Sequence, residues 1–159
     1  MKVTFNFFLT IMFRKTIKFN EYEYETHNDA LNEIELQKIA SSYGFAPKII
    51  DVNFTTDSCE INMEDLGKEH TLFDIYGEEA ENIPKNIWEQ IRHILGILYY
   101  RENIEYIDIT PYNFILLENK VYIIDFGHAQ KKESTDDEEI NYFLEDFLNG
   151  VNEWNEEFY

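Results

Sequence analysis

Residues 105–127 read EYIDITPYNFILLENKVYIIDFG, and the rest of the chain is organised around them. Two apolar, partly β-branched runs at 114–117 and 121–124 flank the polar tripeptide 118–120. Such runs on either side of a short polar segment are typical of a β-hairpin. The hairpin is expected to hold three polar side chains close together: Asp108, Asn113 and Asp125.

The oxygen-bearing groups of these side chains suit the handling of phosphate and Mg²⁺. Mg²⁺ usually takes one or two oxygen ligands from a protein and completes its shell with phosphate and water. Asp125 offers a carboxylate and Asn113 an amide oxygen, and the carboxylate of Asp108 could serve as an orienting group or base. Phosphoryl transfer asks mainly for such positioning and charge neutralisation. The structural alternative is that Asp108 and Asn113 cap a turn and Asp125 ends a strand.

The spacing of the three residues is a second signal. Asn113 stands five residues after Asp108 with Pro111 between them, and Asp125 opens an Asp-Phe-Gly triplet. This pattern resembles the catalytic loop and magnesium-binding motif of the protein-kinase-like superfamily. The chain is similar to its compact atypical serine/threonine kinases, the RIO type among them. The resemblance implies ATP and Mg²⁺ as cofactors, Asn113 and Asp125 as their ligands, and Asp108 as a catalytic residue.

Composition limits the class of protein and its partners. With 159 residues, 44% hydrophobic and 16% aromatic, the chain is expected to form one folded unit. A net charge of −19 argues against nucleic acid or an anionic membrane as partner. A protein substrate or an activating protein is expected instead, and the oligomeric state stays open. The single cysteine, Cys59, rules out a disulfide within this sequence and favours a cytoplasmic, intracellular location.

The first part of the chain is expected to form strands followed by a helix. Residues 5–13 and 16–19 are predicted strands, with a turn at 14–15. The apolar start is too short to cross a bilayer and lacks a small-residue cleavage site, which favours a core strand or hairpin over a secretory signal. Periodic apolar positions predict a helix that begins near Asn28 and ends at Gly44.

The kinase resemblance implies an ion pair between this strand and this helix. Lys18 is the candidate for the catalytic lysine that contacts the phosphates, and Glu33 is the candidate for its partner, with Glu35 as the second choice. Such a pair fixes a flexible ammonium where the phosphates bind. The alternative is that Lys18 is an ordinary strand-edge lysine and Glu33 an exposed helix charge.

The segment 59–67 then implies a hinge. In the resemblance Met63 flanks the adenine, and backbone groups from Glu64 to Leu66 bind its edge. Gly67 permits the chain to reverse. The expected division is one minimal domain over 1–159, with a small lobe over 1–63, a hinge over 64–67 and a shortened helical lobe over 68–159.

The second lobe is expected to be mostly helical. A short helix is predicted over 71–76, a longer one starts after Pro84, and a final one covers 140–154. Between the hairpin and the last helix lies a polar, acidic loop. Ser134 and Thr135 in that loop could accept a phosphate, although a solvated acidic run is the default interpretation.

The sequence also departs from the kinase pattern. No glycine precedes Gly44, so the glycine-rich loop over the phosphates is missing. Tyr106 and Ile107 stand where kinases have His-Arg, and Thr110 replaces a lysine. These differences weaken the case for catalysis.

The expected fold is therefore α+β and kinase-like, with a reduced antiparallel-sheet lobe and a mostly helical lobe. The favoured function is transfer of the γ-phosphate of ATP to a serine or threonine hydroxyl on a protein. Two alternatives remain. One is a pseudokinase that serves as an acidic protein-interaction module, and the other is a small-molecule kinase similar to aminoglycoside or choline kinases.

Overall fold

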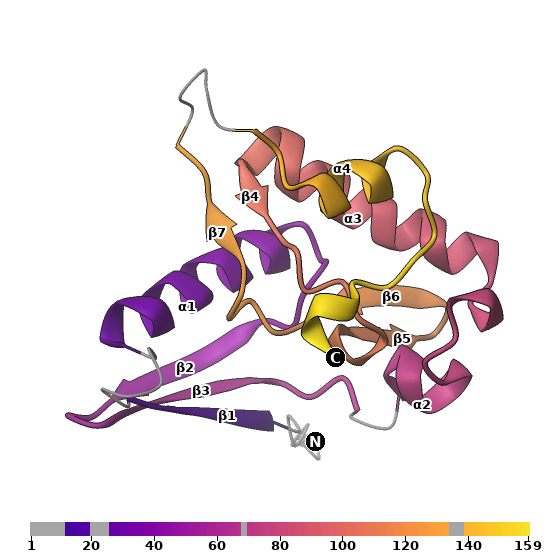
Figure 1. The fold of residues 1–159 in the computed structure, drawn as a ribbon. Helices are drawn as coiled ribbons and strands as arrows, with labels where there is room; N and C mark the ends of the chain where they lie inside the picture. Colours follow the sequence, from indigo (N-terminus) through magenta and orange to yellow (C-terminus); the bar gives the residue numbers. More distant parts are fainter. Residues whose placement is uncertain (1–11, 20–25, 68–69, 134–138) are drawn as a thin grey trace, which may run out of the picture.

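A computed structural model describes residues 12–19, 26–67, 70–133 and 139–159, and it shows an α+β protein (Figure 1). The helices are α1 (His27–Ser42), α2 (Leu72–Tyr76), α3 (Lys85–Glu102) and α4 (Tyr142–Leu148). The strands are β1 (Met12–Lys18), β2 (Ile49–Phe54), β3 (Ser58–Glu64), β4 (Ile104–Glu105), β5 (Phe114–Leu117), β6 (Lys120–Ile123) and β7 (Gln130–Lys131). Short 3-10 turns lie at Ala80–Asn82, Pro111–Asn113 and Glu156–Phe158.

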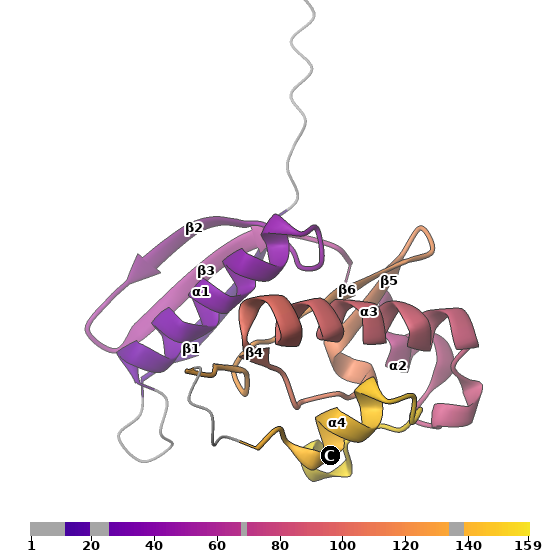
Figure 2. The same cartoon turned by 90° about the horizontal axis from the view of Figure 1, so that it is seen from above.

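The first part of the fold is a three-stranded antiparallel sheet in the order β1-β3-β2, with α1 packed on one face (Figure 2). A cluster of buried side chains fills the space between helix and sheet: Ile17, Ala30, Ile34, Cys59, Ile61 and Met63. A capping box starts α1, because Asp29 N donates to Thr26 Oγ1 at 3.2 Å and Thr26 N donates to Asp29 Oδ2 at 2.8 Å. The helix therefore begins one residue before the predicted start.

The second part is built around α3, whose apolar face is covered by the β5–β6 hairpin and α4. Trp88 of α3 contacts Phe147 of α4 and Trp154 beyond it, with ring centroids 5.8 and 4.3 Å apart. Hydrogen bonds join this part to the first one: Ile123 N donates to Phe45 O at 2.7 Å. The buried side chains form two hydrophobic clusters, and α1 contributes to both of them: Ala30 and Ile34 to the smaller cluster, Leu36 and Ala40 to the larger one.

The predicted hairpin is confirmed. β5 and β6 pair from Phe114 opposite Ile123 to Leu117 opposite Lys120. The sequence allows a turn of two or three residues, and the structure has two, Glu118 and Asn119, with positive φ values of 50° and 64°. A two-residue turn that matches the right-handed twist of the two strands has positive φ values at both residues.

Two predicted boundaries are wrong. β1 runs without a break through Arg14 and Lys15, so the turn predicted there does not exist. The final helix ends at Leu148, because the chain turns at Asn149 and Gly150, where the φ of Gly150 is 113°. The predicted strand over 5–13 falls mostly outside the described residues, as do Ser134 and Thr135. No helix in the described ranges is long and apolar enough to cross a membrane.

Candidate functional site

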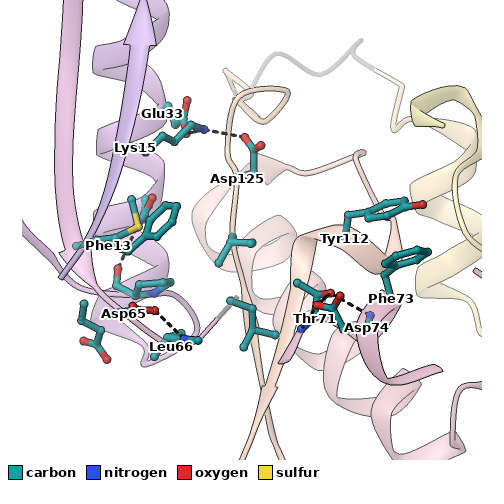
Figure 3. A pocket seen from close by; sticks show the side chains of 17 residues that line it. Phe13, Lys15, Glu33, Asp65, Leu66, Thr71, Phe73, Asp74, Tyr112 and Asp125 are labelled. Atoms are coloured by element: carbon teal, nitrogen blue, oxygen red, sulfur yellow. Dashed lines mark hydrogen bonds and ion pairs between the residues drawn. The ribbon is translucent and has the colours of Figure 1, made fainter. Parts of the chain in front are cut away.

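A cavity of about 530 Å³ lies between the β1-β3-β2 sheet and the β5–β6 hairpin (Figure 3). Its apolar walls come from both parts of the molecule: Phe13, Pro47, Met63, Leu66, Ile115 and Ile124. Lys15, Glu33 and Asp125 lie together at one end, apart from Asp65 and Asp74 (Figure 3). An aromatic stack of Phe73 on Tyr112 lies at another side. The cavity thus combines an apolar slot with a polar end.

Three charged residues from distant parts of the sequence meet at the polar end. Lys15 of β1 bonds directly to the carboxylate of Glu33 on α1, and its Nζ lies 3.1 Å from Asp125 Oδ1 after β6. Glu33 is only 5% exposed. Because a buried carboxylate is costly without a partner, the Lys15 ammonium helps to stabilise Glu33 in this position.

The pair Lys15–Asp125 keeps both groups charged at neutral pH. Burial alone would lower the pKa of Lys15, but the carboxylates of Asp125 and Glu33 outweigh it and raise that pKa. Burial alone would raise the pKa of Asp125, but the Lys15 ammonium and the hydrogen bond from Gly127 N lower it. The site therefore presents fixed charges of both signs to the cavity.

Lys18 does not take the position predicted for it. Side chains alternate along β1, so Phe13, Lys15 and Ile17 face α1, while Lys18 is exposed on the opposite face. Because a turn is predicted at residues 14–15, this alternation is not followed through the strand, and Lys18 instead of Lys15 is assigned to the face toward α1. The structure brings Glu33 rather than the exposed Glu35 to the lysine.

Asp125 has an unusual backbone. Its φ is 60°, in the left-handed region that residues with a side chain rarely adopt. Gly127 N donates to its Oδ1 at 3.2 Å and holds the carboxylate in place. A Cβ at Gly127 would lie 3.2 Å from Asp125 Oδ1 and 3.7 Å from Glu33 Oε2, so glycine here leaves room around both acids.

Asp108 and Asn113 belong to one buried loop beside this end of the cavity. Asn113 Nδ2 donates to Asp108 O at 3.1 Å, which closes the loop. Ile124 N donates to Asn113 O at 2.9 Å, so the loop is tied to the residue before Asp125. Asp108 and Asn113 are therefore in direct contact, and the backbone of Asn113 contacts the residue before Asp125.

His128 is a site residue that sequence reasoning missed. Its Nδ1 lies 3.1 Å from Asp108 Oδ2, while Thr110 Oγ1 donates to Asp108 Oδ1 at 3.4 Å. The sequence places His128 directly after the Asp-Phe-Gly triplet, but this position does not predict a contact with Asp108. Tyr106 supports the same region, because its buried hydroxyl donates to Ile124 O at 2.8 Å.

Four of the six residues predicted to bind a nucleotide line the cavity, whereas Lys18 and Asn113 are not among its lining residues. Met63, Glu64 and Leu66 all line it, and Gly67 follows with a φ of 83°. Asp65 Oδ1 accepts a hydrogen bond from Gly67 N at 2.8 Å, which stabilises the reversal of the chain. Backbone groups at this edge are therefore held in a fixed arrangement.

Asn113 and Asp125 would offer a cation one amide oxygen and one carboxylate. The amide nitrogen of Asn113 donates to Asp108 O, and the contacts of Asp125 use Oδ1. Within the described ranges no group of three or more His, Cys, Asp or Glu side chains is arranged to hold a metal. One amide and one carboxylate suit Mg²⁺ only when a nucleotide supplies further oxygens.

No protein-family model matches the sequence, and no curated protein matches it either.

Proposed function

We propose that this chain is an ATP- and Mg²⁺-dependent phosphotransferase with a two-lobed, kinase-like fold, acting on a serine or threonine hydroxyl of a protein. The observation that carries the proposal is the meeting of Lys15, Glu33 and Asp125 at the polar end of the cavity. A strand lysine, a helix glutamate and the aspartate of Asp-Phe-Gly are the groups with which kinases hold nucleotide phosphates and their metal.

Each residue has a distinct role in this proposal. Lys15 binds the phosphates and Glu33 orients its ammonium. Asn113 and Asp125 hold Mg²⁺, which neutralises the phosphate charge. Asp108 accepts or orients the proton of the acceptor hydroxyl. Lys18 has no part in the site, and Lys15 replaces it in the proposed mechanism.

The remainder of the cavity would hold the adenine. Small-molecule sites are commonly clefts of about 300–1,000 Å³ with apolar walls and a few polar groups. Phe13 and Leu66 offer apolar surface for a planar ring, and the backbone around Asp65 offers hydrogen-bonding groups for its edge. The connection at 64–67 serves as the hinge between the two lobes.

A pseudokinase is the second candidate, and one observation favours it. The carboxylates of Asp108 and Asp125 are both engaged within the protein, the first by His128 and the second by Lys15. A protein that retains the fold without catalysis would keep these internal contacts permanently.

Calorimetry with ATP, in the presence and absence of Mg²⁺, tests the proposal. Wild type is expected to bind ATP only with Mg²⁺, and Lys15→Ala and Asp125→Asn are expected to weaken binding at least about tenfold, or about 1.4 kcal/mol. Lys18→Ala is the matched control, because it removes the same side chain from the opposite face of β1 and should bind normally. Folded wild type that fails to bind ATP would contradict the proposal, and binding without phosphate transfer would favour the pseudokinase.

A further inference from the structure

Residues 154–159 return to the loop that carries Asp108. Figure 1 shows this segment, in yellow, coming back to the middle of the molecule after α4. Trp154 anchors it, with its ring 4.3 Å from that of Trp88 and 6.3 Å from that of Phe114. The segment is thus fixed to the hydrophobic core immediately before it reaches the loop.

Asn155 bonds to the backbone on both sides of Asp108. Its N–H donates to Ile109 O at 2.9 Å, and its Nδ2 donates to Ile107 O at 2.8 Å. Its Oδ1 accepts a hydrogen bond from Glu157 N at 3.3 Å, which fixes the orientation of the amide. Asn155 is 3% exposed, so these bonds are protected from competition with water.

The same segment also contacts the carboxylate partner of Asp108. The Phe158 ring lies with its centroid 5.0 Å from the His128 ring, and His128 Nδ1 is 3.1 Å from Asp108 Oδ2. Residues 154–159 therefore restrain Asp108 in two ways: through the carbonyl groups of its two neighbours, and through the imidazole of His128.

We propose that Asn155 is a positioning residue that holds Asp108 in the orientation needed for phosphate transfer, with Phe158 supporting it through His128. This inference rests on the proposed function of Asp108. A reacting group displaced by about 1 Å can lose on the order of a hundredfold in rate, so the loss of the side-chain bond to Ile107 O should appear in the chemical step. Nucleotide binding should change little, because the hydrogen bonds of Asn155 described above go to Ile107, Ile109 and Glu157, none of which is proposed to hold ATP.

Two substitutions separate the hydrogen bonds from the volume of the side chain. Asn155→Asp keeps the shape of the side chain and the acceptor for Glu157 N, but it cannot donate to Ile107 O. Asn155→Ala removes both side-chain hydrogen bonds, the one to Ile107 O and the one from Glu157 N. Asn152→Ala is the matched control, because Asn152 bonds to Arg92 instead of the Asp108 loop. The assay uses MgATP with water as the phosphate acceptor, alongside calorimetric binding of MgATP and the melting temperature of each variant.

Both Asn155 variants should lower kcat by about tenfold or more, with KM and Kd for MgATP within about threefold of wild type. Asn152→Ala should retain wild-type kcat. An unchanged kcat in Asn155→Asp, an equal loss in Asn152→Ala, or a loss of MgATP binding that parallels the loss of kcat would overturn the inference. If neither Asn155 variant folds, Phe158→Ala decides, because Phe158 is only half-buried: a lower kcat supports the inference and an unchanged kcat refutes it.

Hydrogen exchange distinguishes failure of this inference from failure of the proposed function. If wild type neither binds nor hydrolyses MgATP, the proposed function fails. The restraint is still measurable, since Ile109 N, Thr110 N and Asn113 N form hydrogen bonds inside the loop. Asn155→Asp should speed exchange of these amides without affecting the β5–β6 pairing, and exchange at the wild-type rate would overturn the inference.

Discussion

At the scale of single residues, the charged end of the cavity was only partly predictable. The hairpin between Asn113 and Asp125 was predictable, and in it Ile124, the residue before Asp125, donates to Asn113 O. The lysine of the site was not predicted correctly. Side chains alternate between the two faces of a strand, so an error of one position in the strand pattern assigns a residue to the wrong face. His128 could not be predicted, since its contact with Asp108 depends on the path of the chain after Gly127.

The Lys15–Asp125 pair predicts how stability depends on pH. The lowered pKa of Asp125 stabilises the folded state above about pH 3.9, the ordinary pKa of aspartate, and this contribution is lost as the pH falls through the folded-state pKa. The raised pKa of Lys15 contributes below about pH 10.4 and is lost as the pH rises through its folded-state value.

Melting temperatures of wild type and Asp125→Asn across pH measure this dependence. The advantage of wild type should be constant between about pH 5 and 9 and shrink at both extremes. The same advantage at pH 2 as at pH 7 would show that the charge of Asp125 does not contribute to stability.

Glu33→Gln tests the buried end of the charged group. The substitution keeps the shape of the side chain but removes the negative charge next to Lys15, so the free energy of unfolding should fall by about 1–3 kcal/mol. Glu35→Gln, on the exposed face of α1, should change it by less than about 0.5 kcal/mol. Urea denaturation measures both, and equal values would argue against a structural role for the buried charge.

At the scale of elements, the hairpin was predictable because its signals are local. Apolar runs of suitable length and a polar turn lie within ten or so residues of each other. The ends of β1 and α4 depend on distant contacts, and for that reason the sequence misplaced them. β1 is continuous because it pairs with β3 along its whole length, from Met12 opposite Glu64 to Lys18 opposite Ser58.

The turn of the hairpin gives a test at this scale. Asn119 has a φ of 64°, which asparagine and glycine tolerate and β-branched residues do not. Asn119→Val should therefore lower the free energy of unfolding by about 1–2 kcal/mol, and Asn119→Gly should leave it unchanged or raise it slightly. Thermal melts compare the two, and equal stability of both variants would contradict the left-handed turn.

At the scale of the whole molecule, the α+β class followed from the alternation of strand-like and helix-like segments, and it is confirmed. The cavity could not be derived in the same way. It lies between the β1-β3-β2 sheet and the β5–β6 hairpin, and its walls combine residues as distant as Phe13 and Ile124. Periodicity identifies which side chains are buried within one element, but not how two parts of the fold are spaced.

The direct contact between Lys15 and Asp125 has a thermodynamic consequence. An ammonium already balances the charge of the carboxylate that would hold the divalent cation under the proposed function. Under the proposed function, uptake of a metal–nucleotide complex would then be an exchange of counter-ions, with Lys15 passing from its internal partner to the incoming phosphates. The lysine would act as a resident substitute for the metal and limit the repulsion between Glu33 and Asp125 until the exchange takes place.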